Sequence, residues 1–297
     1  MVHQIICSAY WHLGFSGRIE IGSWLQPLMR VMLHDWPVSP AGRCCGYWLS
    51  ANPRLPQHRI PTQLWRIACC LWLGVAHSFI PAGLQCVTCD AVVDPEGFHY
   101  TLCKGAHATS RHDALVHAVA AMLKAAYPGQ VLIEQLGCFG DETLKRADVV
   151  LMRMAMGGRL IGDVAVACPL ARSYISAAQD RGGAAARRKQ QKVGKYAHLV
   201  AAEDDFTALI FETCGYMSAE VQQLITQTAG AHAEEHAESG DPRDAKACRD
   251  QFIADWQIRL SVVLQRGNAV AVRSRTSRDC AAAGRHGCRH HTEFCFE

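Results

Sequence analysis

The clearest pattern of hydrophobic and polar positions begins near residue 110. Apolar residues recur at helical spacing through Ser110–Ala126, with Ser110 as the expected N-cap and Pro128-Gly129 as the stop. Four short runs rich in β-branched residues come next, and such runs are typical of strands. Three of them precede a second helical stretch and one follows it. These runs are Val131–Glu134, Ala147–Met154, Leu160–Ala167 and, after the helical stretch, Phe206–Phe211. The order helix, three strands, helix, strand predicts an α/β domain with a mixed sheet flanked by helices.

The second and third of these strands are expected to pair as a β-hairpin, because two adjacent glycines lie in the short segment between them. An even-length turn centred on Met156-Gly157 would place Asp163 opposite Val150. Asp163 would then share a face of the sheet with Asp148, about 7–8 Å away between backbones. A three-residue turn would instead place the two aspartates on opposite faces.

Helices are expected on both sides of the last strand. The sequence predicts a long, Ala-rich helix from about Ser173 to Ala202, broken or weakened near Gly182-Gly183. Two further helices are expected at Ala219–Ala229 and Arg249–Val263. Near the other end of the chain, Gln63–Val75 has the pattern of a short buried helix.

Composition and charge add only broad limits. The chain has 297 residues, of which 49% are hydrophobic and 19% charged, as is typical of a globular protein. The net charge of +3 is small, but basic residues gather at Arg181–Lys195 and acidic residues at 234–250. Such asymmetry is compatible with nucleic-acid binding and equally typical of a solvated helix face. The longest apolar run, Ile67–Ala76, has ten residues and is too short to cross a bilayer, so no membrane is expected as a partner.

Cysteine is unusually frequent, with 15 residues in the chain. No arginine-flanked apolar segment with a small-residue cleavage site opens the sequence, so we expect an intracellular, reducing environment. There, clustered cysteines favour metal ligands over disulfides. Most of the cysteines are scattered, and we interpret these as small buried hydrophobic residues.

One cluster has the spacing of a zinc site. Cys86 and Cys89 are separated by two residues, and His99 and Cys103 follow nearby. Zinc prefers four tetrahedral ligands of this kind, and the turn Asp94–Gly97 can bring the second pair back to the first. Since four protein ligands fill the coordination sphere, the expected site is structural rather than catalytic. Two alternatives stay open, namely a histidine other than His99 and a chance cluster in a Cys-rich chain. The other histidines considered are His107 and His112.

A second set of residues has the chemistry of metal-dependent phosphodiester cleavage. Such cleavage uses carboxylates that hold one or two divalent ions and a cation that offsets the developing charge. Asp148 and Asp163 lie in otherwise apolar strands, where an unpaired charge is costly. Glu134 is a third acidic candidate, and Lys192 and Lys195 on the following helix supply the cation. The competing interpretation is a solvated strand edge beside a basic helix surface.

Taken in order, these features resemble the C-terminal module of non-LTR retrotransposon polyproteins, in which a zinc knuckle and a restriction-like endonuclease follow reverse transcriptase. The resemblance covers about two-thirds of the chain. The matching segments are Cys86/Cys89/His99/Cys103, Arg111-His112-Asp113, Glu134, Arg146-Ala147-Asp148, Asp163-Val164-Ala165-Val166 with Pro169, Lys195-Tyr196, Glu212-Thr213-Cys214-Gly215, and Trp256 through Asn268-Ala269.

The resemblance implies a PD-(D/E)XK nuclease fold that nicks DNA at an insertion target in the nucleus. It makes Asp148 and Asp163 ligands of a catalytic Mg²⁺ or Mn²⁺ and Glu134 a third acidic participant. It makes Lys195 or Lys192 the catalytic lysine. DNA is the expected partner, with RNA as a further candidate.

The sequence departs from the family pattern in three respects. Ala147 stands where the motif has proline, and Ala165 stands where it has lysine, so the lysine must come from the helix. The sequence contains no polymerase motif such as Tyr-x-Asp-Asp. Two alternatives to an endonuclease therefore remain: a catalytically inactive, zinc-dependent nucleic-acid-binding remnant, and a fragment that folds only in part.

The expected organisation has four parts. Residues 1–80 form an irregular, partly helical N-terminal segment, and residues 81–108 form the zinc knuckle. Residues 109–272 form the endonuclease domain. Residues 273–297, in which Arg, His and Cys show no period, form a disordered tail.

Overall fold

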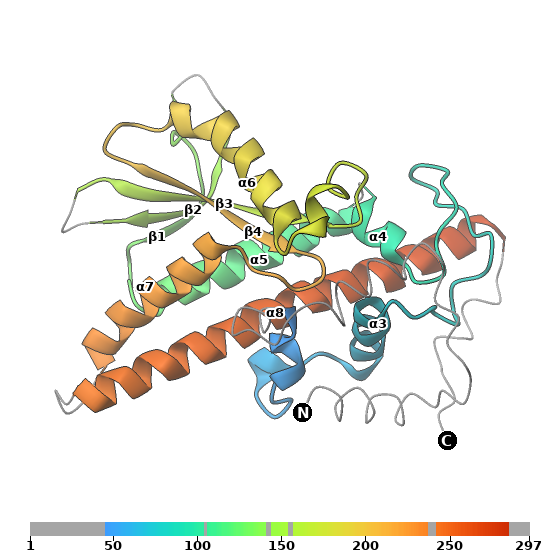
Figure 1. The fold of residues 1–297 in the computed structure, drawn as a ribbon, viewed down its shortest axis with the longest axis horizontal. Coiled ribbons are helices and arrows are strands. Elements are labelled where there is room, and N and C mark those ends of the chain that lie inside the picture. The colour runs from blue at the N-terminus through green and yellow to red at the C-terminus, as the bar shows by residue number, and fades with distance from the viewer. Residues whose placement is uncertain (1–44, 104–105, 141–143, 154–156, 237–241, 285–297) are drawn as a thin grey trace. The chain divides into compact units, whose positions relative to one another are not determined.

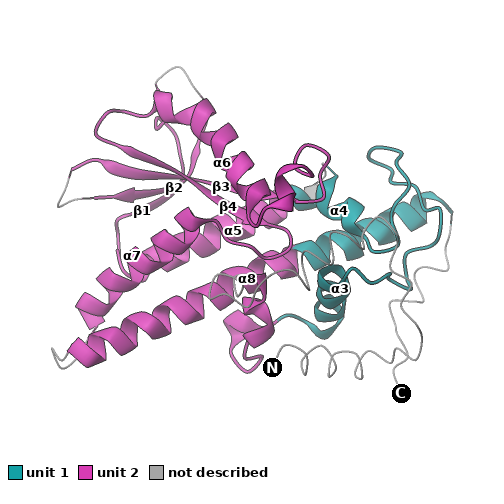
Figure 2. Cartoon of the chain, in the orientation of Figure 1, with its two compact units in different colours: residues 1–39, 60–108, 268–297 teal, residues 40–59, 109–267 magenta. Residues whose placement is uncertain are grey.

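The computed structural model describes a chain of mixed α/β structure (Figure 1). Its described residues fall into two compact units (Figure 2): the first holds residues 60–108 and those from 268 on, and the second holds those up to 59 and 109–267. The region 60–80, expected to belong to an N-terminal segment, thus lies in the same unit as the cysteine cluster. The described residues are 45–103, 106–140, 144–153, 157–236 and 242–284.

A four-stranded mixed sheet forms the centre of the second unit. Its strands follow the order β1-β2-β3-β4, with β1–β2 and β2–β3 antiparallel and β3–β4 parallel. The parallel pair is joined by a crossover that contains a helix, as is usual for such pairs. The predicted α/β class, with a mixed sheet flanked by helices, is therefore confirmed. The strands are β1 (Val131–Gln135), β2 (Ala147–Met152), β3 (Arg159–Ala167) and β4 (Asp205–Glu212).

In β2, β3 and β4 the side chains alternate between two mostly buried faces, because successive residues of a strand point to opposite sides. Val149 and Phe211 belong to the core shared with α5 (Ala106–Lys124), α7 (Ala219–His236) and the first part of α8 (Pro242–Ala282). On the other face, strand residues pack against α6 (Gly183–Tyr196), whose alanines allow close approach. The strand residues of this second face include Val150, Ile161, Ala165, Ala208 and Ile210, and the buried alanines of α6 are Ala184 and Ala185.

The predicted helix from Ser173 to Ala202 is wrong in extent. The structure has a short 3-10 turn, η4 (Ala177–Gln179), and then α6, which begins only at Gly183. Gly182 precedes α6 with a φ of +70°, a backbone conformation that favours glycine. The break expected near Gly182-Gly183 is therefore present, and the continuous helix begins only after Gly182. A second 3-10 turn, η5 (Ala197–Leu199), follows α6.

Two further helices also differ from the prediction at their ends. Helix α5 begins at Ala106, so Ser110 lies inside the helix rather than at its N-cap. Helix α8 has 41 residues and starts with Pro242, which suits a first helical position. It runs through the expected Arg249–Val263 helix and continues to Ala282. The expectation of disorder is therefore wrong for residues 273–282, while 285–297 lie outside the described residues.

The hairpin register differs from the expected one by an even number of residues. Val150 pairs with Ile161 rather than with Asp163. The paired residues end at Val149 and Gly162, and continuing this register by one residue sets Asp148 level with Asp163. The two aspartates therefore occupy corresponding positions on neighbouring strands, which is closer than the diagonal arrangement that was predicted. The turn residues 154–156 lie outside the described residues.

The first unit contains α3 (Thr62–Leu73), the short α4 (Phe98–Leu102) and the residues of α8 from 268 on. The predicted buried helix at Gln63–Val75 is confirmed as α3, which buries six of its residues. Two short 3-10 turns, η2 (Tyr47–Ser50) and η3 (Pro56–His58), belong to the second unit. None of the described helices is both long and apolar enough to cross a membrane.

Candidate functional site

The first two cysteines of the cluster lie in a tight loop of the first unit. The amide of Cys86 donates to the carbonyl of Ala91 (2.9 Å), and the amide of Asp90 donates back to the Cys86 carbonyl (2.8 Å). Asp90 has a φ of +57°, which lets the chain reverse within these few residues. The loop therefore brings the thiols of Cys86 and Cys89 to one side.

The second pair of candidate ligands is positioned by an aspartate that caps α4. The Asp94 carboxylate accepts hydrogen bonds from the amides of Phe98 (2.8 Å) and His99 (2.6 Å). A carboxylate in this place satisfies amides that have no partner within the helix. The Cys103 amide donates to the His99 carbonyl (2.8 Å), so these two residues lie one helical turn apart. The turn expected at Asp94–Gly97 is thus formed.

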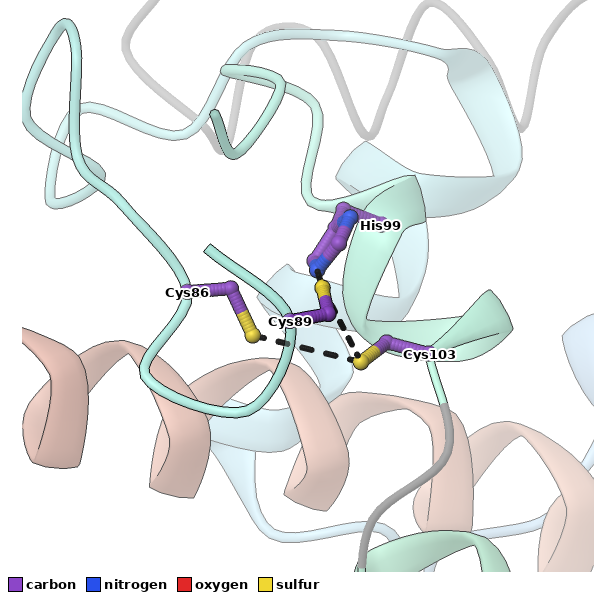
Figure 3. Close-up of side chains that lie close together, drawn as sticks. All are labelled: Cys86, Cys89, His99 and Cys103. Atoms are coloured by element: carbon purple, nitrogen blue, oxygen red, sulfur yellow. Dashed lines mark hydrogen bonds between the residues drawn. The ribbon is translucent and has the colours of Figure 1, made fainter. Parts of the chain in front are cut away.

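The four side chains converge on one point (Figure 3). The ligand atoms of Cys86, Cys89, His99 and Cys103 all lie within 4.8 Å of one another. The Sγ of Cys103 is 3.9 Å from that of Cys86 and 3.6 Å from that of Cys89, and Cys89 Sγ is 3.5 Å from His99 Nε2. Zinc bonds of about 2.0–2.3 Å at tetrahedral angles require ligand separations of roughly 3.5–3.8 Å.

The cluster could therefore hold a metal ion such as zinc. Among the described residues, it is the one group of three or more such ligands that lie close enough together. Its histidine is His99, whereas the alternatives His107 and His112 do not belong to it.

Hydrogen bonding in the cluster favours a thiolate at Cys86. Burial alone would raise the pKa of this thiol, but hydrogen bonds from the Thr88 amide and from His99 lower it to about 6. The Thr88 amide lies 3.4 Å from the sulfur. Burial raises the pKa of Cys103. Because the thiolate is the form that binds metals, Cys86 is prepared to act as a ligand near neutral pH.

In the second unit, Asp163 on β3 forms a buried ion pair with α6. Its side chain is 11% exposed, and Lys192 Nζ lies 2.7 Å from Oδ2 and 3.0 Å from Oδ1. Burial raises the pKa of Asp163, Lys192 opposes that shift, and nearby Asp148 adds to it. Two acidic groups and a lysine therefore share one electrostatic environment.

Asp148 on β2 is held by a different set of groups. Its Oδ2 accepts a hydrogen bond from the Val164 amide (2.6 Å) and lies 3.2 Å from His112 Nε2. Hydrogen bonds to Asp148 and to Asp113 raise the pKa of His112 to about 9, although its burial opposes this. A protonated imidazole thus faces the carboxylate. The resemblance singled out Arg111-His112-Asp113, but nothing in the sequence placed His112 beside Asp148.

Glu134 does not join these carboxylates. The register of β1 and β2 pairs Ile133 with Val149 and Gln135 with Ala147, which leaves Glu134 level with Asp148. However, Glu134 has a φ of +53° and its side chain is exposed. This backbone conformation is uncommon for a residue with a Cβ, and it interrupts the alternation of the strand.

The structure distinguishes the two candidate lysines. Lys192 contacts Asp163, whereas Lys195 is exposed and its ammonium lies 5.0 Å from the centre of the Tyr196 ring. Lys145 and Lys192 lie 5.1 Å and 5.4 Å from the same ring. Three ammonium groups thus surround one tyrosine beside the acidic pair.

Glu212, at the end of β4, forms a buried hydrogen bond with α6. Glu212 is 3% exposed, and its Oε1 accepts a hydrogen bond from the Ala185 amide at the start of α6 (2.8 Å). Burial raises the pKa of Glu212. The contact joins the end of β4 to the beginning of α6.

Comparison of the sequence with models of known protein families, and with curated proteins, finds no match.

Proposed function

We propose that the chain is a metal-dependent DNA endonuclease module with a restriction-like fold and a structural zinc knuckle, as its resemblance to the non-LTR retrotransposon module implies. One observation carries the proposal: the strand register sets Asp148 beside Asp163 on adjacent strands, and Lys192 of α6 forms an ion pair with Asp163. Two acids and a lysine in this arrangement suit phosphodiester hydrolysis.

The donor set fits the proposed ion. Mg²⁺ takes oxygen ligands and is commonly held by one or two carboxylates together with water. When bound, it supplies Lewis acidity to the hydrolysis. Asp148 and Asp163 provide the carboxylate oxygens, and Lys192 provides a positive charge to offset charge on the phosphate. Lys192, rather than Lys195, is then the catalytic lysine.

A second function is favoured by a specific observation. In the cysteine cluster, four possible metal ligands lie within 4.8 Å of one another. Among the described residues, Asp148 and Asp163 have no third acidic or histidine side chain gathered with them at such distances. The lysines around Tyr196 can still bind phosphates without cutting. A catalytically inactive, zinc-dependent nucleic-acid-binding module is therefore the second candidate.

Nicking of supercoiled plasmid separates the two functions. The purified protein is assayed with Mg²⁺ or Mn²⁺ beside D148A, D163A and the control D250N, whose carboxylate is exposed and pairs with Lys246. Nicking that needs the ion, persists in D250N and vanishes in the other two variants supports the endonuclease. If all proteins are equally inert but bind DNA with a steep salt dependence, the binding module is supported instead.

The zinc knuckle is tested separately. We expect one zinc ion per chain in the purified protein, measured by elemental analysis. The double variant C86S/C89S should lose the ion. The variant C248S should keep it, because Cys248 lies outside the cluster. Zinc-free wild-type protein that cannot be loaded would contradict this part of the proposal.

A further inference from the structure

One arginine lies against the cysteine cluster without being one of its ligands. Arg275 on α8 is 1% exposed, and its Nη2 lies 3.2 Å from Cys86 Sγ. Its Nη1 donates to the carbonyls of Cys103 (3.1 Å) and Tyr100 (3.5 Å). The guanidinium also lies 5.1 Å from the centre of the Tyr100 ring. All four residues belong to the first unit.

A buried guanidinium needs a compensating negative charge, because its desolvation is costly. The nearby carboxylate of Asp279 has other partners: it accepts a hydrogen bond from the Tyr100 hydroxyl (3.1 Å) and pairs with Arg278 Nε (3.0 Å). Two sulfur-bearing side chains of the cluster interact with Arg275 instead: its Nη2 contacts Cys86 Sγ, and Cys103 interacts with the guanidinium as well.

The proposed zinc centre would supply that charge. Three thiolates and one neutral imidazole around a divalent ion leave one net negative charge. An arginine N–H that points at a thiolate offsets this charge and draws electron density from the sulfur. Groups that hydrogen-bond to metal ligands in this way orient the ligands and tune the metal's affinity.

We infer that Arg275 is a positioning residue of the metal centre: it offsets the thiolate charge at Cys86 and fixes the end of α4 through the Cys103 carbonyl. This inference rests on the proposed zinc site. Two further hydrogen bonds connect this part of α8 with the same region. Arg278 donates to the Thr88 hydroxyl (2.8 Å), and Asp279 accepts from the Tyr100 hydroxyl. This part of α8 is thus a component of the metal centre.

Metal affinity is the first measurement. Zinc and cobalt binding to the full-length chain is measured by competition with a chromophoric chelator for wild type, R275M, R275K and the control R273M. Arg273 is exposed on the same helix. We expect R275M to bind about 10- to 100-fold more weakly. R275K should recover part of the loss, because lysine restores the charge but lacks the planar guanidinium that reaches Cys86 and the Cys103 carbonyl together. R273M should match wild type.

The second measurement is the spectrum of the cobalt-loaded protein. Loss of an N–H donor leaves more electron density on the sulfur, so the sulfur-to-cobalt charge-transfer band should move to lower energy in R275M. It should return toward the wild-type position in R275K. A residue that only stabilises the fold would leave the spectrum of the loaded protein unchanged, whatever the fraction loaded.

The outcomes separate this inference from the zinc proposal. If wild type binds neither zinc nor cobalt, the metal centre itself is wrong. If wild type binds both, and R275M shows the same affinity and the same charge-transfer energy, the centre stands and the role of Arg275 is overturned. Circular dichroism of each apo variant reports whether the helices still form.

Discussion

At the scale of single residues, burial separates two lysines that the sequence left equivalent. Lys192 pairs with the buried Asp163, and K192M would leave that carboxylate without its partner. We expect K192M to lower the free energy of unfolding by about 3 kcal/mol, as for a broken buried ion pair. K195M should change it by less than about 0.5 kcal/mol, because Lys195 is exposed. Denaturant unfolding at pH 7 without divalent ions measures both, and equal effects would contradict the distinction.

His77 gives a prediction about pH. The residue is 4% exposed, and burial lowers its pKa to about 4 from an ordinary value near 6.5. Between these two values the unfolded chain takes up a proton that the folded chain does not. Stability is therefore lost as pH falls from about 6.5 to about 4, by about 3 kcal/mol from this group, and this loss is complete below that range.

The variant H77Q should remove this contribution and flatten the dependence of unfolding free energy on pH over that interval. H117Q is the control, since His117 is exposed on α5. A proton NMR titration of His77 checks the cause directly. If His77 titrates near pH 6.5 in the folded protein, the explanation fails.

Sequence separation decides which residues of the candidate sites were predictable. The ligands of the cysteine cluster lie within 18 residues of chain, so their spacing and the capping aspartate Asp94 are local signals. The contact between His112 and Asp148 joins positions 36 apart, and that between Arg275 and Cys86 joins positions 189 apart. No local pattern encodes such contacts, which arise only when the elements pack.

At the scale of elements, the hairpin glycines differ in what surrounds them. Gly157 and Gly158 both have positive φ, but a Cβ at Gly158 would collide with the carbonyl of Glu203, whereas no atom of the described residues lies within 4 Å of one at Gly157. We expect G157A to cost about 1 kcal/mol from backbone strain alone. G158A should cost at least about 2 kcal/mol more, because backbone must move. Thermal unfolding of the two variants compares them, and similar costs would refute the difference.

Elements were predictable where apolar periodicity defines them and less so where distant contacts extend them. The strands and the hairpin follow from β-branched runs and glycines. The last turns of α8 carry arginine, serine and threonine rather than an apolar stripe, and were expected to be disordered. They are helical where Arg275, Arg278 and Asp279 contact the cysteine cluster and α4. Most helical stability in proteins comes from such packing rather than from propensity.

At the scale of the whole molecule, the long helix α8 is divided between the two units. Residues of α8 up to Gly267 belong to the unit with the sheet, and those from Asn268 on belong to the unit with the cysteine cluster. Among its described residues, the first unit contains α3, α4, the first residues of α5 and the end of α8, and no strand. A small unit of this kind commonly depends on a bound metal, whose binding free energy then contributes directly to its folding.

The two units should therefore respond differently to metal removal. Hydrogen exchange is compared in zinc-loaded protein and after chelation. We expect chelation to raise amide exchange at least roughly 100-fold in residues 84–103 and 268–282, because local opening there no longer has to release the ion. Exchange in β2 and β3 should stay unchanged, since their core contains no residue of the cluster. After chelation, the amides of α8 before residue 268 should stay protected from exchange, and those from residue 268 on should lose protection. A uniform loss across α8 and the sheet would mean that the chain unfolds as one cooperative unit.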